Sequence, residues 1–143
     1  MTRMNTTRIL LGGLLAGLIM NVGEAALHAA VLGDATGQLY VDLHLPLPSP
    51  GIDLAILIGM TFVLGIASVW LYAAIRPRFG AGAKTALVAG LAVWVLAHLW
   101  SGVYLGSGYT GIITAKLAWL PVIWGFVEAP LATLSGAALY KEG

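Results

Sequence analysis

Four long apolar runs, separated only by short polar or glycine- and proline-rich stretches, constrain this chain more than any other feature. Each run holds about 20 residues, the length that an α-helix needs to cross the hydrocarbon core of a bilayer. Only 9% of the 143 residues are charged, whereas a soluble domain carries about 25%. We therefore predict a single integral membrane domain over 1–143, an all-α antiparallel bundle of four transmembrane helices. We expect it in a bacterial cytoplasmic membrane.

Glycine, proline and charged residues mark the ends of the predicted helices. Gly33 and Asp34 are expected to end the first helix, and Arg76-Pro77 the second, because proline disfavours a helical residue before it. The intervening segment is predicted to be an apolar outer loop, 33–51, which folds back on the bundle or meets a partner. The four helices are predicted at about 7–32, 52–75, 84–105 and 112–140.

Basic residues are distributed unevenly between the two sets of helix ends. The ends that would share one side carry Arg3, Arg8, Arg76, Arg78, Lys84 and Lys141. The opposite side carries Asp34, Asp42 and Asp53, with Lys116 as its basic residue. Because Lys and Arg accumulate on the cytoplasmic side of membrane proteins, both termini are predicted to be cytoplasmic.

The N-terminal run also has features of a signal peptide, since Arg3 and Arg8 precede it and small residues follow near 25–30. The run is longer than the apolar core of a signal peptide, and Glu24 would lie near its end. We therefore expect this segment to remain in place as the first helix.

Charge and cysteine content exclude several classes of function. The formal net charge is +1, so no nucleic-acid partner is expected. The chain has no cysteine, which removes disulfides, thiolate nucleophiles and iron–sulfur sites. No Ser/His/Asp arrangement, phosphate loop or nucleotide-binding fingerprint is present, and whether the chain is an enzyme stays open. The expected partners are the lipid bilayer and either further copies of the chain or a larger membrane complex.

One stripe along the first run combines small and polar residues. At 100° per residue its members fall within a face about 80° wide, and they are Gly13, Gly17, Asn21, Glu24 and His28. Within a membrane-spanning helix, ionisable groups are expected to face protein rather than lipid. The stripe therefore predicts the face by which the first helix contacts its neighbours.

Polar residues on all four predicted helices reach a similar depth. At 1.5 Å per residue from the basic ends, Glu24, Thr61, His98 and Glu128 lie about 20–24 Å from that side. Asn21 comes out at about 20 Å and His28 at about 30 Å. Each also lies on a stripe with small residues, as in Gly90, Trp94, His98 and Ser101. We therefore predict a buried polar site of Glu24, His98 and Glu128, with Asn21, His28 and Thr61 at its periphery and Trp94 and Trp124 as walls.

Three interpretations of this layer remain open. The side chains could hydrogen-bond one another and fix the helix register, which is worth about 1 kcal/mol or less per bond. They could form a proton-transfer or small-ligand site, which intramembrane ionisable groups often mark. They could hold a metal or a haem, since two carboxylates and an imidazole suit Fe, Mn or Zn.

The sequence signals for a metal and for a haem are weak. The Glu-x-x-His pattern of di-iron helix bundles is absent. A haem held by His28 and His98 is disfavoured because their predicted depths differ by about 9 Å. The leading prediction is a small integral membrane protein with a buried Glu/His site for a proton, a small ligand, or a metal or cofactor. The alternative is a non-catalytic accessory or assembly subunit of a membrane complex, with 33–51 as its contact.

Overall fold

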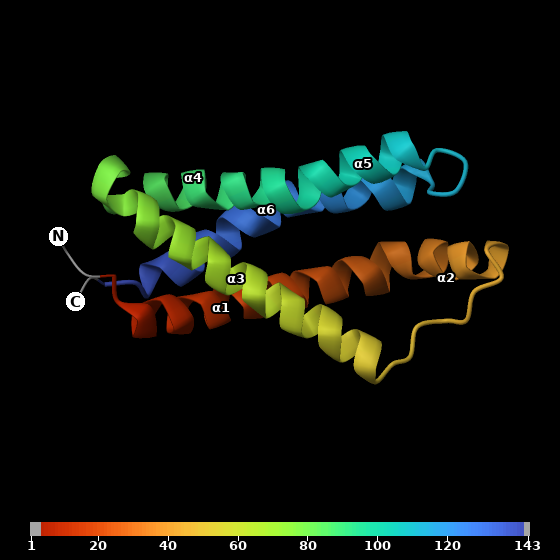
Figure 1. Ribbon diagram of the computed structural model, residues 1–143, viewed down its shortest axis with the longest axis horizontal. Helices are drawn as coiled ribbons and strands as arrows, with labels where there is room; N and C mark the ends of the chain where they lie inside the picture. The colour runs from red at the N-terminus through yellow and green to blue at the C-terminus, as the bar shows by residue number, and fades with distance from the viewer. Residues whose placement is uncertain (1–3, 142–143) are drawn as a thin grey trace.

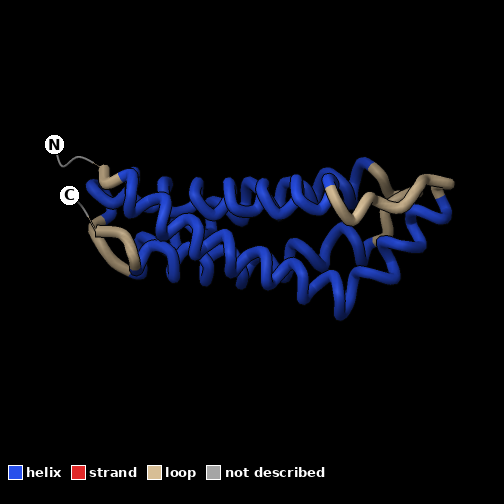
Figure 2. Tube along the Cα trace, turned by 90° about the horizontal axis from the view of Figure 1, so that it is seen from below, coloured by secondary structure: helices blue, strands red, loops and turns tan. Residues whose placement is uncertain are grey.

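The computed structural model describes residues 4–141, and every regular element in that range is helical. Both ends of the described chain lie at one end of the bundle, which we call the terminal end (Figure 1). Figure 2 shows that the loops gather at this end and at the opposite one, which we call the distal end. Four helical segments are long and apolar enough to cross a membrane: Thr6–Asp42, Ile52–Phe79, Ala83–Gly108 and Ala115–Ala138.

The first segment is longer than predicted, because α1 (Thr6–Leu27) continues through a π-helical stretch η1 (His28–Leu32) into α2 (Gly33–Asp42). Gly33 keeps a right-handed helical backbone, with φ −53° and ψ −51°, whereas a glycine that ends a helix takes the left-handed conformation. The predicted end at residue 32 and the predicted loop 33–51 are therefore wrong. The loop covers only residues 43–51.

The end of α2 is set by a residue other than glycine. His44 takes the left-handed conformation, with φ 53°. Its N–H donates to the Val41 carbonyl at 3.1 Å, and the Leu45 N–H donates to the Tyr40 carbonyl at 2.9 Å. These two bonds form the Schellman arrangement that closes helices. Because glycine or asparagine normally occupies the left-handed position, a histidine there could not be anticipated from the sequence.

The second segment, α3 (Ile52–Phe79), begins where predicted but runs past Pro77. Proline removes one hydrogen-bond donor, a loss that the last turn of this helix accommodates. The helix ends instead at Gly80, which has φ 85° and donates its N–H to the Arg76 carbonyl at 2.9 Å. The predicted end at residue 75 is thus corrected to Phe79.

The third segment consists of α4 (Ala83–Trp94), the π-helical stretch η2 (Val95–Leu99) and α5 (Trp100–Gly108). The fourth is α6 (Ala115–Ala138), whose start is fixed by the Thr114 side chain, which accepts a hydrogen bond from the Leu117 N–H. The predicted start at residue 112 is therefore three residues early, and the segment before Thr114 is a loop.

The helices come closest through small residues in the half of the bundle nearer the terminal end. α3 crosses over α1 (Figure 1), and there a Cβ added to Gly13 would overlap the Cα of Ile66. A Cβ on Gly17 would lie 2.8 Å from the Cα of Phe62. The two glycines of the predicted stripe thus face a neighbouring helix of the same chain, as close helix packing requires.

The buried face of α1 lies to one side of the predicted stripe. Its centre is formed by Ala16, Met20 and Leu27, which are at most 3% exposed. Asn21 is half-buried and His28 is exposed. On a helical wheel these two residues lie at the far edge of the stripe, about 100° or more from that centre. The stripe therefore overlaps the contact face at Gly13 and Gly17, whereas Asn21 and His28 lie beside that face.

Candidate metal centre

Three ionisable side chains from three helical segments converge near the middle of the bundle. Glu24 comes from α1, His98 from η2 and Glu128 from α6. Each offers one ligand atom, a carboxylate oxygen or an imidazole nitrogen, and these atoms all lie within 4.8 Å of one another. The structure thus brings together the three residues that the sequence placed at the centre of the polar site.

Glu128 is the most enclosed of the three, with 7% of its surface exposed. Its Oε1 accepts a hydrogen bond of 2.9 Å from the indole N–H of Trp124, one turn earlier on α6. Its Oε2 is buried and has no hydrogen-bond partner among residues 4–141. A buried acceptor without a partner costs about 1–3 kcal/mol, and more when it is charged. This oxygen therefore needs a proton, a cation or a water molecule.

Two glycines make room for the cluster. A Cβ on Gly23 of α1 would overlap Oε1 of Glu128. A Cβ on Gly125 of α6 would lie 2.5 Å from Nδ1 and 2.8 Å from Cδ2 of His98. Each glycine thus admits a site residue from a neighbouring helix. Gly125 belongs to the stripe of small residues predicted around Glu128, whereas nothing distinguished Gly23 among the 19 glycines of the sequence.

The π-helical stretch η2 carries His98 toward the cluster and rotates the residues after it. The Trp100 N–H donates to the Val95 carbonyl, five residues earlier, so the stretch holds more residues per turn than an α-helix. Gly102 is consequently buried and Ser101 is exposed, the reverse of what uniform α-helical spacing predicted. π-helical turns occur frequently at functional sites, and the sequence showed no sign of this one.

No family model, curated protein or solved structure matches this chain. Its function therefore has to be inferred from the geometry of the cluster.

The three residues predicted at the periphery are not brought to the cluster. The Asn21 amide donates to the Gly17 carbonyl at 2.8 Å and to the Ile58 carbonyl of α3 at 3.4 Å. The Thr61 hydroxyl donates to the Leu57 carbonyl of its own helix at 3.0 Å. His28 begins η1, is exposed, and lies outside the cluster. The structure therefore gives no support to a haem held between His28 and His98.

The two predicted wall residues have different positions. Trp124 contacts the site directly through its hydrogen bond to Glu128. The Trp94 indole N–H instead donates to the Val122 carbonyl at 2.8 Å. The Trp94 ring meets Phe126 edge to face, with the centroids 5.1 Å apart. Trp94 therefore connects α4 to α6, and its indole N–H is not directed to Glu128.

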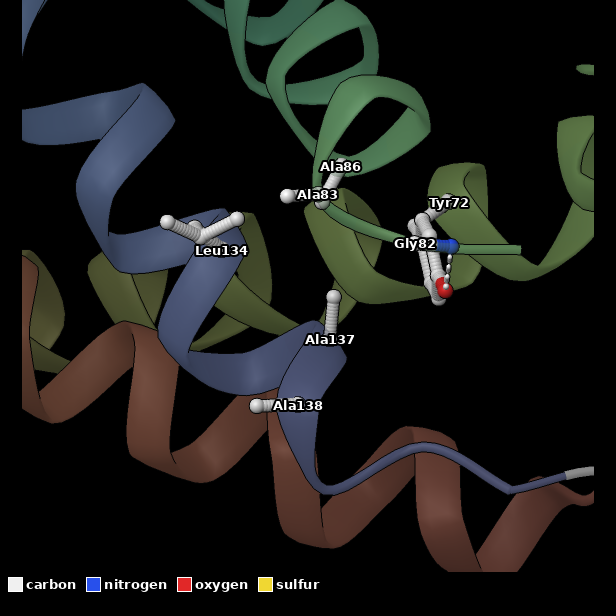
Figure 3. Close-up of a pocket in the computed structure, with 7 residues that line it drawn as sticks. All are labelled: Tyr72, Gly82, Ala83, Ala86, Leu134, Ala137 and Ala138. Carbon is white, nitrogen blue, oxygen red and sulfur yellow. Dashed lines mark hydrogen bonds between the residues drawn. The ribbon is translucent and has the colours of Figure 1, made fainter. Parts of the chain in front are cut away.

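Two surface pockets lie elsewhere. One of about 190 Å³ opens at the terminal end and is lined mainly by alanines, with the Tyr72 hydroxyl accepting a hydrogen bond from the Gly82 N–H at 3.3 Å (Figure 3). A second of about 450 Å³ lies between α1 and α3 and is lined by Ile9, Trp70 and other largely apolar residues. Neither lining includes a His, Asp or Glu side chain, so neither carries the chemistry of the cluster.

The donor set fits a divalent transition metal. Two carboxylates and one imidazole are ligands of Zn²⁺, Mn²⁺ and Fe²⁺. Two carboxylates with a neutral imidazole balance a charge of +2, which suits a site with low polarity around it. Ligand atoms about 2.0–2.2 Å from a tetrahedral metal are about 3.5 Å apart. The limit of 4.8 Å seen here is wider, so binding would draw the three side chains together.

Proposed function

We propose that this protein is a small integral membrane protein that binds a divalent transition metal ion within the bilayer through Glu24, His98 and Glu128. The proposal is supported by the convergence of these side chains from three helical segments. Oε2 of Glu128 is also buried and has no hydrogen-bond partner in the described chain. A bound ion would supply this oxygen with a positive charge and would act as a Lewis acid at the centre of the bundle. The residues of the chain would hold the ion between three helical segments.

A metal accounts for the geometry better than a purely structural network. Charged groups within a bilayer cost a few kcal/mol each even on the milder insertion scales, so a network that stabilises the bundle has to satisfy both oxygens of a buried carboxylate. Oε1 of Glu128 is satisfied by Trp124, but Oε2 has no partner within residues 4–141. The remaining interpretations are a proton shared between the Glu24 and Glu128 carboxyl groups and a water molecule bound to Oε2. Metal binding is the measurement that separates both of them from a metal site.

Metal binding is tested with the protein purified in mild detergent and titrated with Co²⁺, whose visible absorption reports its ligands. We expect about one Co²⁺ per chain. Glu24→Gln, His98→Ala and Glu128→Gln should each weaken binding at least about 10-fold, because each removes a ligand and even supporting residues are worth about 10–100-fold. Asp53→Asn, which changes an exposed carboxylate bonded to the Ser49 N–H, is the control. Absence of a cobalt spectrum, or equal weakening by the control, would overturn the proposal.

We further propose that the helices cross a bacterial cytoplasmic membrane with both termini on the cytoplasmic side. The distribution of basic residues supports this orientation, and the common position of the two chain ends supports a single side for both (Figure 1).

The orientation is tested with single cysteines, because the chain has none of its own. Ser49→Cys lies in the distal loop and Ala81→Cys lies in the turn between α3 and α4. In intact cells an impermeant thiol reagent should label residue 49, and residue 81 only after permeabilisation. Reversed labelling would contradict the orientation while leaving the metal site untouched.

A second function, that of an accessory or assembly subunit in a membrane complex, is favoured by the distal loop. Leu43, Leu45 and Leu47 are exposed there, in a segment outside the four apolar helical segments. Exposed apolar side chains in such a segment mark a contact with a partner. A protein that retains no cobalt in the titration above would make this the leading function.

A further inference from the structure

The three side chains of the cluster are too few to fill the coordination sphere of a metal ion. The inference drawn from this rests on the proposed metal site. We infer that Trp124 restricts Glu128 to one ligating oxygen and thereby keeps a coordination position open for a small neutral donor, such as water or an imidazole. Trp124 is thus a positioning residue, acting through Glu128, and the site binds a second, exogenous ligand beside the metal.

The protein supplies three ligand groups to the centre. Within residues 4–141 the metal-ligating group around this point consists of Glu24, His98 and Glu128. Structural zinc sites use four protein ligands, whereas sites with three keep a position for water or substrate. The centre therefore belongs to the open class unless one carboxylate supplies both of its oxygens.

The carboxylate of Glu128 is oriented by its surroundings. Its Oε1 is held by the Trp124 indole N–H at 2.9 Å and lies so close to Gly23 that a Cβ there would overlap it. Its Oε2 has no hydrogen-bond partner in the part of the chain that the structure describes. The hydrogen bond to Oε1 orients the carboxylate and occupies one lone pair of that oxygen, so Oε2 is the oxygen with no competing partner.

Two other polar side chains on the same helical segments already have hydrogen-bond partners. The Asn21 amide is turned toward the Gly17 and Ile58 carbonyls. The Ser101 hydroxyl donates to the Ala97 carbonyl at 2.6 Å and to the His98 carbonyl at 3.0 Å. Both side chains direct their protons to backbone carbonyls, and in the described chain neither forms a hydrogen bond with Glu24, His98 or Glu128.

Two of the three ligating side chains are only partly enclosed. Glu128 is buried, whereas Glu24 and His98 are half-buried. α1 packs against α3 and α6, and α5 and η2 pack against α6. Glu24 and His98 therefore lie on segments that both pack against α6, the helix that carries Glu128.

The charge of the centre selects the kind of ligand. A divalent ion, two carboxylates and a neutral imidazole sum to zero. An added anion would leave a net negative charge in surroundings of low polarity, where an uncompensated charge costs several kcal/mol. A neutral oxygen or nitrogen donor avoids this cost.

The experiment uses the cobalt-loaded full-length protein in mild detergent, titrated with imidazole and, separately, with azide. In the wild type, imidazole should give a new visible spectrum with cobalt retained, at a lower concentration than azide requires. In Trp124→Phe, Oε1 loses its donor and becomes free to bind the metal, so the imidazole concentration needed should rise at least about 10-fold while cobalt stays bound. Trp94→Phe, which removes an indole N–H bonded to the Val122 carbonyl, should respond like the wild type.

Each outcome is decisive. If imidazole leaves the wild-type cobalt spectrum unchanged, or only removes the cobalt, the open position is overturned while the metal site stands. If azide binds more readily than imidazole, the neutral class of ligand is wrong. If Trp124→Phe binds imidazole as the wild type does, Trp124 has no positioning role. The wild-type titration needs no variant, so misfolding of Trp124→Phe would not prevent a decision. Failure of the metal site itself would appear earlier, as the absence of any cobalt spectrum.

Discussion

The two halves of the bundle are built differently. In the half near the terminal end, α1, α3, α4 and α6 meet through glycine and alanine. Backbones come so close there that a Cβ on Gly90 of α4 would lie 2.5 Å from the Cα of Pro130 of α6. In the distal half, α2 has no buried residue, and residues 52–60 of α3 are all exposed. Figure 1 shows α3 diverging from the other helices toward this end.

Aromatic and polar contacts also stabilise the terminal half. The rings of Tyr72 and Tyr140 meet edge to face, with centroids 5.9 Å apart. The Arg76 guanidinium lies 5.5 Å from the centroid of the Tyr140 ring, a cation–π contact. The Tyr140 hydroxyl accepts a hydrogen bond of 3.4 Å from the Asn5 N–H. These contacts connect the start of α1 with the ends of α3 and α6.

The difference shows what holds helices together in a chain of this composition. Lipid tails are as apolar as leucine, so transmembrane helices associate through close packing and polar contacts rather than through the burial of large apolar side chains. The first nine residues of α3 are mostly large and apolar, and all nine are exposed. The Glu24, His98 and Glu128 cluster lies at the boundary between the two halves. On its distal side α5 still packs on α6, where a Cβ on Gly102 would overlap the Val122 side chain.

The largest expected effect is that of filling a close contact in the terminal half. Gly17→Leu should lower the free energy of unfolding by about 3 kcal/mol or more, because Phe62 leaves no space for a side chain. Gly59→Leu makes the same change in the distal half of α3, where nothing lies within 4 Å of a Cβ in the described chain. It should be neutral or stabilising by up to about 1 kcal/mol, since glycine is a poor helix former. The free energy of unfolding of both variants is measured in mixed micelles. Equal losses of stability in the two variants would contradict the contrast between the halves.

A smaller effect tests whether the boundary cluster is one unit. Two carboxylates within 4.8 Å of each other repel when charged, so removing either one relieves the other. Glu24→Gln and Glu128→Gln in the metal-free protein should therefore be non-additive in free energy of unfolding by about 0.5–3 kcal/mol. The control cycle pairs Glu24→Gln with Asp53→Asn, which should be additive within about 0.5 kcal/mol. Additivity in both cycles would mean that the two glutamates act separately.

The sequence determined the all-helical class and the four long apolar helices, because their length and composition follow from local residue content. It also placed Glu24, His98 and Glu128 at similar depth, since depth along a straight helix depends only on residue count. The ends of the helices were less predictable. Gly33 was expected to end a helix and does not, while His44 ends one, because either residue can adopt helical or left-handed backbone.

The contacts of the site were decided by the tertiary structure. The extra residue per turn in η2 buries Gly102 in place of Ser101, and no local pattern encodes that change. Glu128 packs against Gly23, and His98 packs against Gly125. Both contacts depend on how three helices approach one another, and a helical wheel drawn for one helix does not show this. Depth along each helix is a one-dimensional property that the sequence carries, whereas which side chain meets which neighbour depends on helix rotation and crossing, and these are fixed only when all the helices pack together.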